Sequence, residues 1–151
     1  MKHIVLISCV SKKQETKNSG PIPAKELYIS PLFKKALEYA TTLSPDYIYI
    51  LSAEHHLLPL DKEVEKYDKT LNKMSAEECK QWSQEVLTEL KAKGHDLEKD
   101  KFTFLAGDKY CKYILRENSI KNVHQVYKEN GLKGIGYILR FLTQTNDNNG
   151  L

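Results

Sequence analysis

The fold is decided near the start of the chain by Ile4-Val5-Leu6-Ile7, an apolar run that stops abruptly at Ser8-Cys9. A run without polar alternation is typical of a strand buried on both faces, as in parallel sheets. Similar runs recur at Tyr47–Leu51 and Phe102–Ala106, and a weaker one lies at Val123–Tyr127. Helical patterns separate these runs. The sequence therefore predicts an α/β fold, with a single domain and a mostly parallel sheet of about four strands flanked by helices.

Capping residues mark the boundaries of the helices between these strands. Ser30-Pro31 places an N-cap before a proline at the first helical position, and this helix is expected to end near Ser44-Pro45. A capping box over Ser75–Glu78 opens the next helix, and Gly94 fits its C-cap. The apolar stripe of that helix predicts that Trp82 faces the sheet and has a structural role.

The remaining segments set the limits of the domain. A short helix is expected to open at Gly107-Asp108, and a last helix is expected over Gly134–Thr143. The stretch Leu57–Thr70 contains a proline and many charges, so we interpret it as a loop. Residues 144–151 are polar, and we expect a disordered tail there. The predicted domain therefore covers residues 1–143.

Composition and motifs argue against several classes of protein. The chain has 151 residues with 23 basic and 20 acidic side chains, and its net charge of +3 permits a local basic patch without requiring nucleic acid. Its three cysteines form no CxxC motif, which argues against a disulfide framework or a cysteine zinc site. Dinucleotide-binding, P-loop and serine-hydrolase motifs are absent from the sequence. Without a long apolar run or a signal-peptide pattern, we expect a cytoplasmic protein with no membrane contact.

Polar or titratable residues follow each of the first three strands, at the carboxyl ends where parallel sheets bind ligands. Cys9 is either a nucleophile, with a thiolate favoured by neighbouring lysines, or a small half-buried residue. His55 and His56 are adjacent, and adjacent side chains on an extended chain point in opposite directions, so we expect a polar contact rather than a metal site. Gly107 opens a helix that either holds an anion or is capped by Asp108.

Several tyrosines lie outside the apolar stripes. The chain has nine tyrosines against one tryptophan and four phenylalanines. Tyr28, Tyr67 and Tyr110 fall in polar loops or at helix starts, close to lysines. Such pairs could stack bases and contact phosphates, and the alternative is a set of partly buried tyrosines surrounded by solvated lysines.

Motifs spread over nearly the whole chain form one set. They are Ser8-Cys9-x-x-Lys12-Lys13, Ala24-x-Glu26-Leu27-Tyr28-x-Ser30-x-x-Phe33, Leu51-Ser52-Ala53-x-His55-x-Leu57-Leu58, Tyr67-Asp68-x-Thr70-Leu71, Trp82 and Ala106-Gly107-x-x-Tyr110. As a set they resemble a domain family of unknown function, DUF6884. This family usually has glycine at the position of His56, so the sequence leaves open whether a tight turn is kept there.

Two more distant similarities imply a link to nucleic acid. The pattern Leu51-Ser52-Ala53 with Leu57-Leu58-x-Leu60 and Tyr67 is similar to the peroxide-stress protein YaaA family, which implies DNA binding and protection from oxidative damage. The pattern Cys9-x-x-Lys12 with Tyr28-x-Ser30 is similar to the core of an archaeosine-synthase-like domain, which implies tRNA modification.

The shared motif residues form the predicted site, because most are polar and lie outside the apolar stripes. Asp68 is expected to act as a general base or to stabilise an oxocarbenium ion, His55 to act as a general acid and Cys9 as a nucleophile. The expected ligand-binding residues, among which Lys12 would hold a phosphate, are Ser8, Lys12, Tyr28, Ser30, Ser52, Tyr67, Gly107 and Tyr110. One pocket is expected to contain Cys9, Tyr28, Ser30, Ser52, His55, Asp68 and Tyr110, with no metal.

Three functions fit such a site. The first is an enzyme directed at a nucleotide or a nucleic-acid base, cleaving or exchanging an N-glycosidic bond without a cofactor. The second is a non-catalytic DNA-binding stress or phage-defence protein, which needs an extended basic surface of Lys12, Lys13, Lys17, Lys34, Lys35, Lys109 and Lys112. The third is a regulatory module that binds a nucleotide-like ligand in a closed pocket. The sequence leaves the oligomeric state open.

Overall fold

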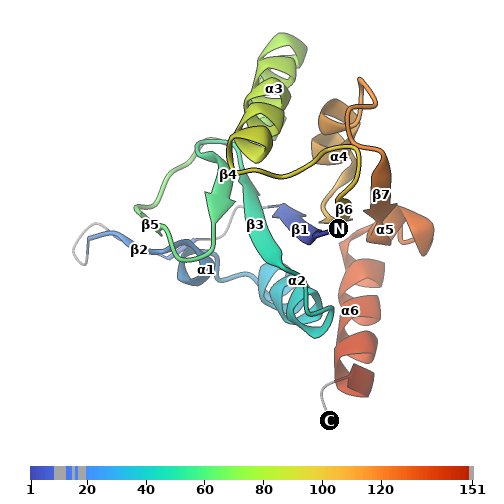
Figure 1. Cartoon of the computed structure of the whole chain (residues 1–151). Coiled ribbons are helices and arrows are strands. Elements are labelled where there is room, and N and C mark those ends of the chain that lie inside the picture. The colour runs from blue at the N-terminus through green and yellow to red at the C-terminus, as the bar shows by residue number, and fades with distance from the viewer. Residues whose placement is uncertain (9–12, 15, 17–19, 150–151) are drawn as a thin grey trace.

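A computed structural model describes residues 1–8, 13, 14, 16 and 20–149 of the chain (Figure 1). Its centre is a five-stranded sheet in the order β4-β3-β1-β6-β7. Four of these strands run parallel, and β4 pairs antiparallel with β3 at one edge. The strands are β1 (His3–Ser8), β3 (Tyr47–Ser52), β4 (His56–Pro59), β6 (Lys101–Leu105) and β7 (Asn122–Gln125).

The four parallel strands are the four apolar runs of the sequence. Strand β1 lies at the centre, where Val5 pairs with Ile48 of β3 on one side and with Thr103 of β6 on the other. The predicted single α/β domain with a mostly parallel sheet is confirmed, with five strands in place of about four. The additional strand is β4, which begins at His56 and continues into the stretch 57–70 that the sequence predicted as a loop.

Helices cover both faces of the sheet, because the side chains of each strand alternate between two cores. Ile4 and Leu6 of β1 face the core under α3 (Ala76–Ala92) and α4 (Asp108–Ile114), whereas Val5 and Ile7 face the opposite core. Figure 1 shows α3 on one side of the sheet and α2 and α6 on the other. The helices over the second face are α1 (Ala24–Leu27), α2 (Pro31–Thr42), α5 (Val126–Glu129) and α6 (Ile135–Asn149).

The predicted caps are confirmed. The Ser30 hydroxyl accepts a hydrogen bond from the Phe33 amide at 3.2 Å and begins α2. The capping box of α3 is complete, because the Ser75 hydroxyl accepts from the Glu78 amide and the Glu78 carboxylate accepts from the Ser75 amide. Gly94 follows the end of this helix with a φ of +84°, a left-handed conformation that glycine adopts without strain.

Two C-terminal boundaries differ from the prediction. Strand β7 ends at Gln125 and α5 begins at once, so the segment 126–127 predicted as strand is helical. Helix α6 continues to Asn149, into the stretch predicted as a tail, because the buried Asn146 amide donates to the Lys35 carbonyl of α2 at 3.1 Å. Residues 150–151 lie outside the described part of the chain.

Smaller elements complete the fold. A two-stranded antiparallel pair joins β2 (Ile22–Pro23) to β5 (Glu63–Val64), and a 3₁₀ turn, η1 (Leu71–Lys73), precedes α3. Over the described residues, every helix is too short or too polar to cross a membrane.

The strand order creates a switch point beside β1. The chain leaves β1 toward β3 on one side, whereas it leaves β6 toward β7 on the other side. Ligands of open α/β sheets bind outside the carboxyl ends of the strands at such a point. A ligand site is therefore expected at the edge formed by Ser8, Ala106-Gly107 and Gln125, with Ser52 beyond it on β3.

Candidate functional site at the carboxyl edge of the sheet

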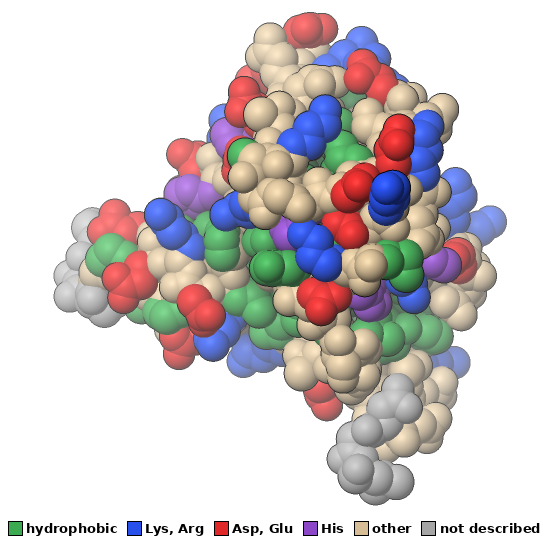
Figure 2. Space-filling view, viewed as in Figure 1, with side chains coloured by type: hydrophobic (Ala, Val, Ile, Leu, Met, Phe, Trp, Pro, Cys, Tyr) green, Lys and Arg blue, Asp and Glu red, His purple; other side chains and the backbone are tan. Residues whose placement is uncertain are grey.

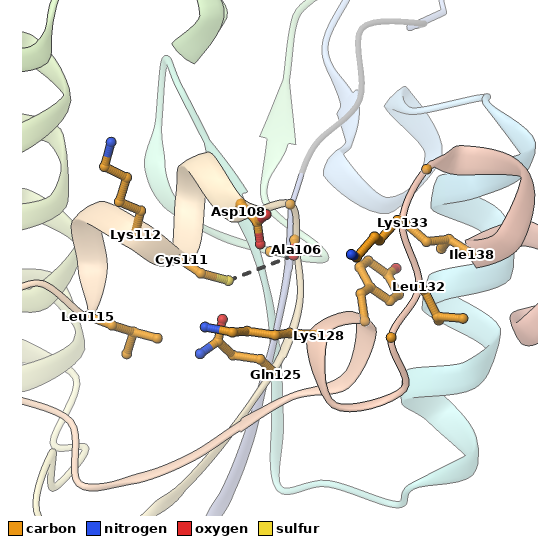
Figure 3. A pocket seen from close by; sticks show the side chains of 14 residues that line it. Ala106, Asp108, Cys111, Lys112, Leu115, Gln125, Lys128, Leu132, Lys133 and Ile138 are labelled. Carbon is orange, nitrogen blue, oxygen red and sulfur yellow. Dashed lines mark hydrogen bonds between the residues drawn. The ribbon is translucent and has the colours of Figure 1, made fainter.

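A large cavity at this edge, which we call the lysine cavity, lies where β6 and β7 end. Its volume is about 850 Å³, and its walls come from α4, α5, the start of α6 and the loop between the last two helices. Figure 3 shows Lys133 extending across the cavity toward the side of Asp108, and Lys128 lying alongside Gln125. The polar and charged side chains that line the cavity include Asp108, Lys112, Gln125, Tyr127, Lys128 and Lys133.

The electrostatics of the lysine cavity favour an anion. Lys112, Lys128 and Lys133 are exposed, and none of them forms an ion pair with another residue that the structure describes. Asp108 contributes the single carboxylate among the lining residues. Three ammonium groups against one carboxylate leave a local excess of positive charge, which attracts phosphate groups.

Cys111 lies in the wall of this cavity but is not a nucleophile. Its thiol is buried and donates a weak hydrogen bond to the Ala106 carbonyl, with the sulfur 3.7 Å from the oxygen. Burial, and secondarily the carboxylate of Asp108, raises the pKa of the Cys111 thiol to about 12. A thiol that stays protonated at neutral pH lacks the reactive thiolate form.

A second and smaller cavity, which we call the apolar pocket, adjoins the first at the switch point. Its volume is about 170 Å³, and it shares Gly107, Tyr127 and Ile138 with the lysine cavity. Two further residues of the predicted site, Ser8 at the end of β1 and Tyr110 on α4, line it. The pocket therefore gathers three of the predicted ligand-binding residues, namely Ser8, Gly107 and Tyr110.

A third group, which we call the tyrosine cluster, lies at the carboxyl end of β3 and consists of Lys13, Tyr28, Ser52, His55 and Tyr67. The Tyr67 hydroxyl shares hydrogen bonds with the Tyr28 hydroxyl and, at 2.8 Å, with the Ser52 hydroxyl. Ser52 also accepts from the His55 amide at 3.0 Å, and the His55 ring meets the Tyr67 ring edge to face. Lys13 lies over the Tyr67 ring, 4.5 Å from its centre. Predicted residues from three loops therefore converge here.

The environment of His55 determines its protonation state. Burial lowers the pKa of this imidazole, and the nearby carboxylate of Glu54 opposes the shift. His55 is therefore neutral at pH 7 and takes up a proton only in more acidic solution. A neutral imidazole can still donate a hydrogen bond from its N–H group.

The other predicted residues have different surroundings. Ser30 caps α2, and Tyr28 and Ser52 are fully buried, so their hydroxyl groups already contact the protein. Asp68 follows Tyr67 in the chain, is exposed and makes no hydrogen bond or ion pair with another described residue. Cys9 and Lys12 lie outside the described residues.

Sequence reasoning missed the residues that follow the fourth parallel strand. Gln125, Tyr127 and Lys128 line the lysine cavity, but the apolar pattern placed the end of this strand at Tyr127. With the strand end at Gln125, the rule that ligands bind after parallel strands would have included all three. Lys133 belongs to a glycine-containing loop before α6, which carried no motif.

His56 is part of a separate cluster on the outside of β4. Its Nδ1 lies 3.2 Å from a carboxylate oxygen of Glu89, and Glu85 is the third member. The potential ligand atoms of these three side chains lie within 4.8 Å of one another, the one such group of metal-ligand type among the described residues. His56 has a φ of +59°, so the tight turn is kept although glycine is absent. The ion pair accounts for the observed geometry without an ion.

Comparisons with known proteins agree with the motifs in the sequence. The family of unknown function DUF6884 matches residues 4–144. The uncharacterized protein YfjM of Bacillus subtilis (strain 168) is 31% identical over 155 residues, and the match covers 95% of each chain. No solved structure gives a match. Because the family match spans nearly the whole domain and the relative aligns almost end to end, this chain belongs to the DUF6884 family.

Proposed function

We propose that this protein is an enzyme directed at a nucleotide or a nucleic-acid base, and that it cleaves or exchanges an N-glycosidic bond. The observation that carries the proposal is the lysine cavity, which lies at the carboxyl ends of β6 and β7, beside the switch point, with three lysines that have no ion-pair partner in the described chain. A cavity of about 850 Å³ is in the size range of small-molecule and cofactor sites. The anion that such a cavity attracts is the phosphate of a nucleotide.

The proposed reaction distributes its roles along the sheet edge. Lys128 and Lys133 hold the phosphate, and a carboxylate faces the sugar. In hydrolysis the bond between C1′ and the base nitrogen breaks, its electron pair leaves with the base, and the base takes up a proton. Water adds to C1′ and gives its proton to the carboxylate, while in exchange a second base replaces the water.

Two carboxylates compete for the role beside the sugar. The sequence motifs predict that Asp68 is the carboxylate beside the sugar, and its exposed side chain has no partner among the described residues. Asp108 lines the lysine cavity itself. His55 remains the proposed acid, and because its pKa is lowered, base release is expected to accelerate as pH falls below neutrality.

The two other functions have less support. Figure 2 shows basic and acidic side chains interspersed over the visible face, and Lys13, which a basic surface for DNA would have used, is buried in the tyrosine cluster. A regulatory module would use the same lysine cavity but perform no reaction. The distant similarities to a DNA-protection family and a tRNA-modification domain fit a nucleic-acid substrate as well as a free nucleotide.

The test is release of free base from a panel of substrates. The purified protein is incubated with nucleoside monophosphates, single- and double-stranded DNA and RNA, and released bases are measured by liquid chromatography with mass spectrometry. The wild type is expected to release base, and either Asp68→Asn or Asp108→Asn is expected to abolish release with a nearly unchanged melting temperature. Lys25→Gln, which breaks an exposed ion pair with Asp61 away from the cavity, is the control.

Three results would overturn the proposal. One is the absence of base release from every substrate. Another is release that neither carboxylate variant reduces. The third is salt-dependent DNA binding or saturable nucleotide binding without turnover, which would favour the DNA-binding protein or the regulatory module.

A further inference from the structure

We propose that the apolar pocket holds the base of the substrate, and that it accepts a single six-membered ring, so that the protein selects pyrimidine over purine nucleotides. This inference rests on the proposed function, because it places the phosphate of the same ligand in the lysine cavity. Beyond that function, it specifies the class of base that is recognised and assigns its recognition to the apolar pocket.

The two cavities are arranged as a nucleotide requires. They adjoin at Gly107, Tyr127 and Ile138, so one molecule can place a charged end in the first and a flat apolar end in the second. On its other side the apolar pocket is bounded by β1, and the tyrosine cluster with His55 lies one strand further along, at the end of β3. His55 lines neither cavity, but it lies on the side of the apolar pocket away from the lysine cavity, which is the side of the base.

The size of the apolar pocket restricts the ring. A closed apolar cavity of about 150 Å³ holds benzene. The apolar pocket is partly open, and at about 170 Å³ it has room for one such ring between its walls. A pyrimidine has the same six-membered ring with small substituents, whereas a purine adds a fused second ring. The walls are mainly apolar or aromatic, with Phe33 and Tyr110 among them, which suits the faces of a base.

Tyr127 is the polar group at the junction of the two cavities. Its side chain is 8% exposed and lines both cavities. Its hydroxyl group forms no hydrogen bond with any residue that the structure describes. Burial raises the pKa of Tyr127, with smaller contributions from Cys111 and Tyr39, so the hydroxyl keeps its proton. Among the described residues, the enclosed side-chain polar atom without a partner is Asn146 Oδ1, so the Tyr127 hydroxyl is accessible from the cavities and open to a ligand. A pyrimidine carbonyl, or the sugar next to it, supplies an acceptor at this position.

The experiment is calorimetric titration of the full chain with five probes, namely uridine, cytidine, adenosine and guanosine 5′-monophosphates and ribose 5-phosphate. The two pyrimidine nucleotides are expected to bind about tenfold or more tightly than the purine nucleotides and ribose 5-phosphate. Tyr127→Phe removes only the hydroxyl and is expected to reduce pyrimidine binding about tenfold while leaving ribose 5-phosphate unchanged. Tyr137→Phe, at an exposed tyrosine of α6 outside both cavities, is the matched control.

Lys128→Gln and Lys133→Gln separate this inference from the proposed function. If these variants weaken the binding of all five probes equally but the wild type shows no preference for pyrimidines, the assignment of the apolar pocket to the base is wrong and the phosphate site stands. Equal effects of Tyr127→Phe and Tyr137→Phe would also overturn the base pocket. If no probe binds at millimolar concentration, the phosphate site fails and the base pocket fails with it.

Discussion

At the scale of single residues, His56 shows how a strained conformation is compensated. A non-glycine residue with positive φ carries a cost of about 1–3 kcal/mol. The carboxylate of Glu89 contacts the His56 ring at 3.2 Å and also accepts from the Leu57 amide at 3.4 Å. These contacts hold the turn that leads from β3 into β4, next to His55 of the tyrosine cluster.

Two substitutions separate strain from ion pairing at this position. Both His56→Gly and His56→Ala lose the contact with Glu89, in which both side chains are about one-third exposed and which stabilises by less than about 1 kcal/mol. Only glycine also relieves the positive φ. We expect the glycine variant to be more stable than the alanine variant by about 1 kcal/mol in urea unfolding. Equal stability of the two variants would show that the turn is unstrained.

His95 links stability to pH through buried hydrogen bonds. The Lys2 ammonium group, which can only donate, lies 3.1 Å from Nδ1, so Nε2 carries the proton and donates to the Tyr49 hydroxyl at 2.8 Å. Burial, and secondarily the charge of Lys2, lowers the pKa of His95. Burial likewise lowers the pKa of His3 and His55.

The sign of the resulting pH dependence follows from these shifts. The folded state favours neutral histidines, so their contribution is complete above the ordinary histidine pKa of 6.5 and is lost as pH falls toward the lower folded values. We expect the free energy of unfolding to fall between about pH 7 and pH 5, above the range in which carboxylates titrate. His95→Gln should flatten this slope. A free energy of unfolding that does not change with pH over this range would contradict the lowered pKa values of these histidines.

At the scale of elements, α3 is connected to the site through Trp82. The side chain is 3% exposed, as the apolar stripe predicts, and its indole N–H donates to the Ser52 carbonyl at 2.8 Å. Ser52 is also the residue whose hydroxyl meets Tyr67. Packing of α3 on the sheet therefore fixes the end of β3 from which the tyrosine cluster is built.

Two substitutions at Trp82 distinguish packing from hydrogen bonding. Trp82→Ala is expected to destabilise the protein by about 3–5 kcal/mol, because it leaves a large cavity in the core. Trp82→Phe keeps most of the apolar area but leaves the Ser52 carbonyl without its donor, at a cost of about 1–3 kcal/mol. Denaturant unfolding with both variants measures the difference. A loss below about 1 kcal/mol for Trp82→Ala would mean that the indole is not packed in solution.

Elements with strong local signals are the ones that the sequence predicts. The buried runs of β1, β3 and β6 and the capping box of Ser75 have local causes, so they appear without tertiary information. Strand β4 was missed because four residues in a charged segment carry no period, and its pairing with β3 supplies the reason to extend. Helix α6 passes its predicted end because contact with α2 outweighs the polar composition of its last turns.

At the scale of the whole molecule, the sheet topology determines where the candidate site lies. The strand-end rule identified the carboxyl edge from Ser8, Ser52 and Gly107, and these residues do lie at the ends of β1, β3 and β6. The division of that edge into a lysine cavity, an apolar pocket and a tyrosine cluster could not be predicted. It depends on the packing of α5 and α6 beside β7 and on which hydroxyl groups find partners inside the protein.

Chemical-shift mapping can show directly whether a nucleotide binds at the carboxyl edge. The ¹⁵N-labelled protein is titrated with uridine 5′-monophosphate, and backbone amide shifts are followed to saturation. We expect saturable shifts concentrated at residues that line the lysine cavity, namely Gly107, Gln125, Tyr127, Gly131 and Gly134. Shifts confined to the outer face of α3 or to the β2–β5 pair, or no shifts at millimolar nucleotide, would contradict nucleotide binding at this edge.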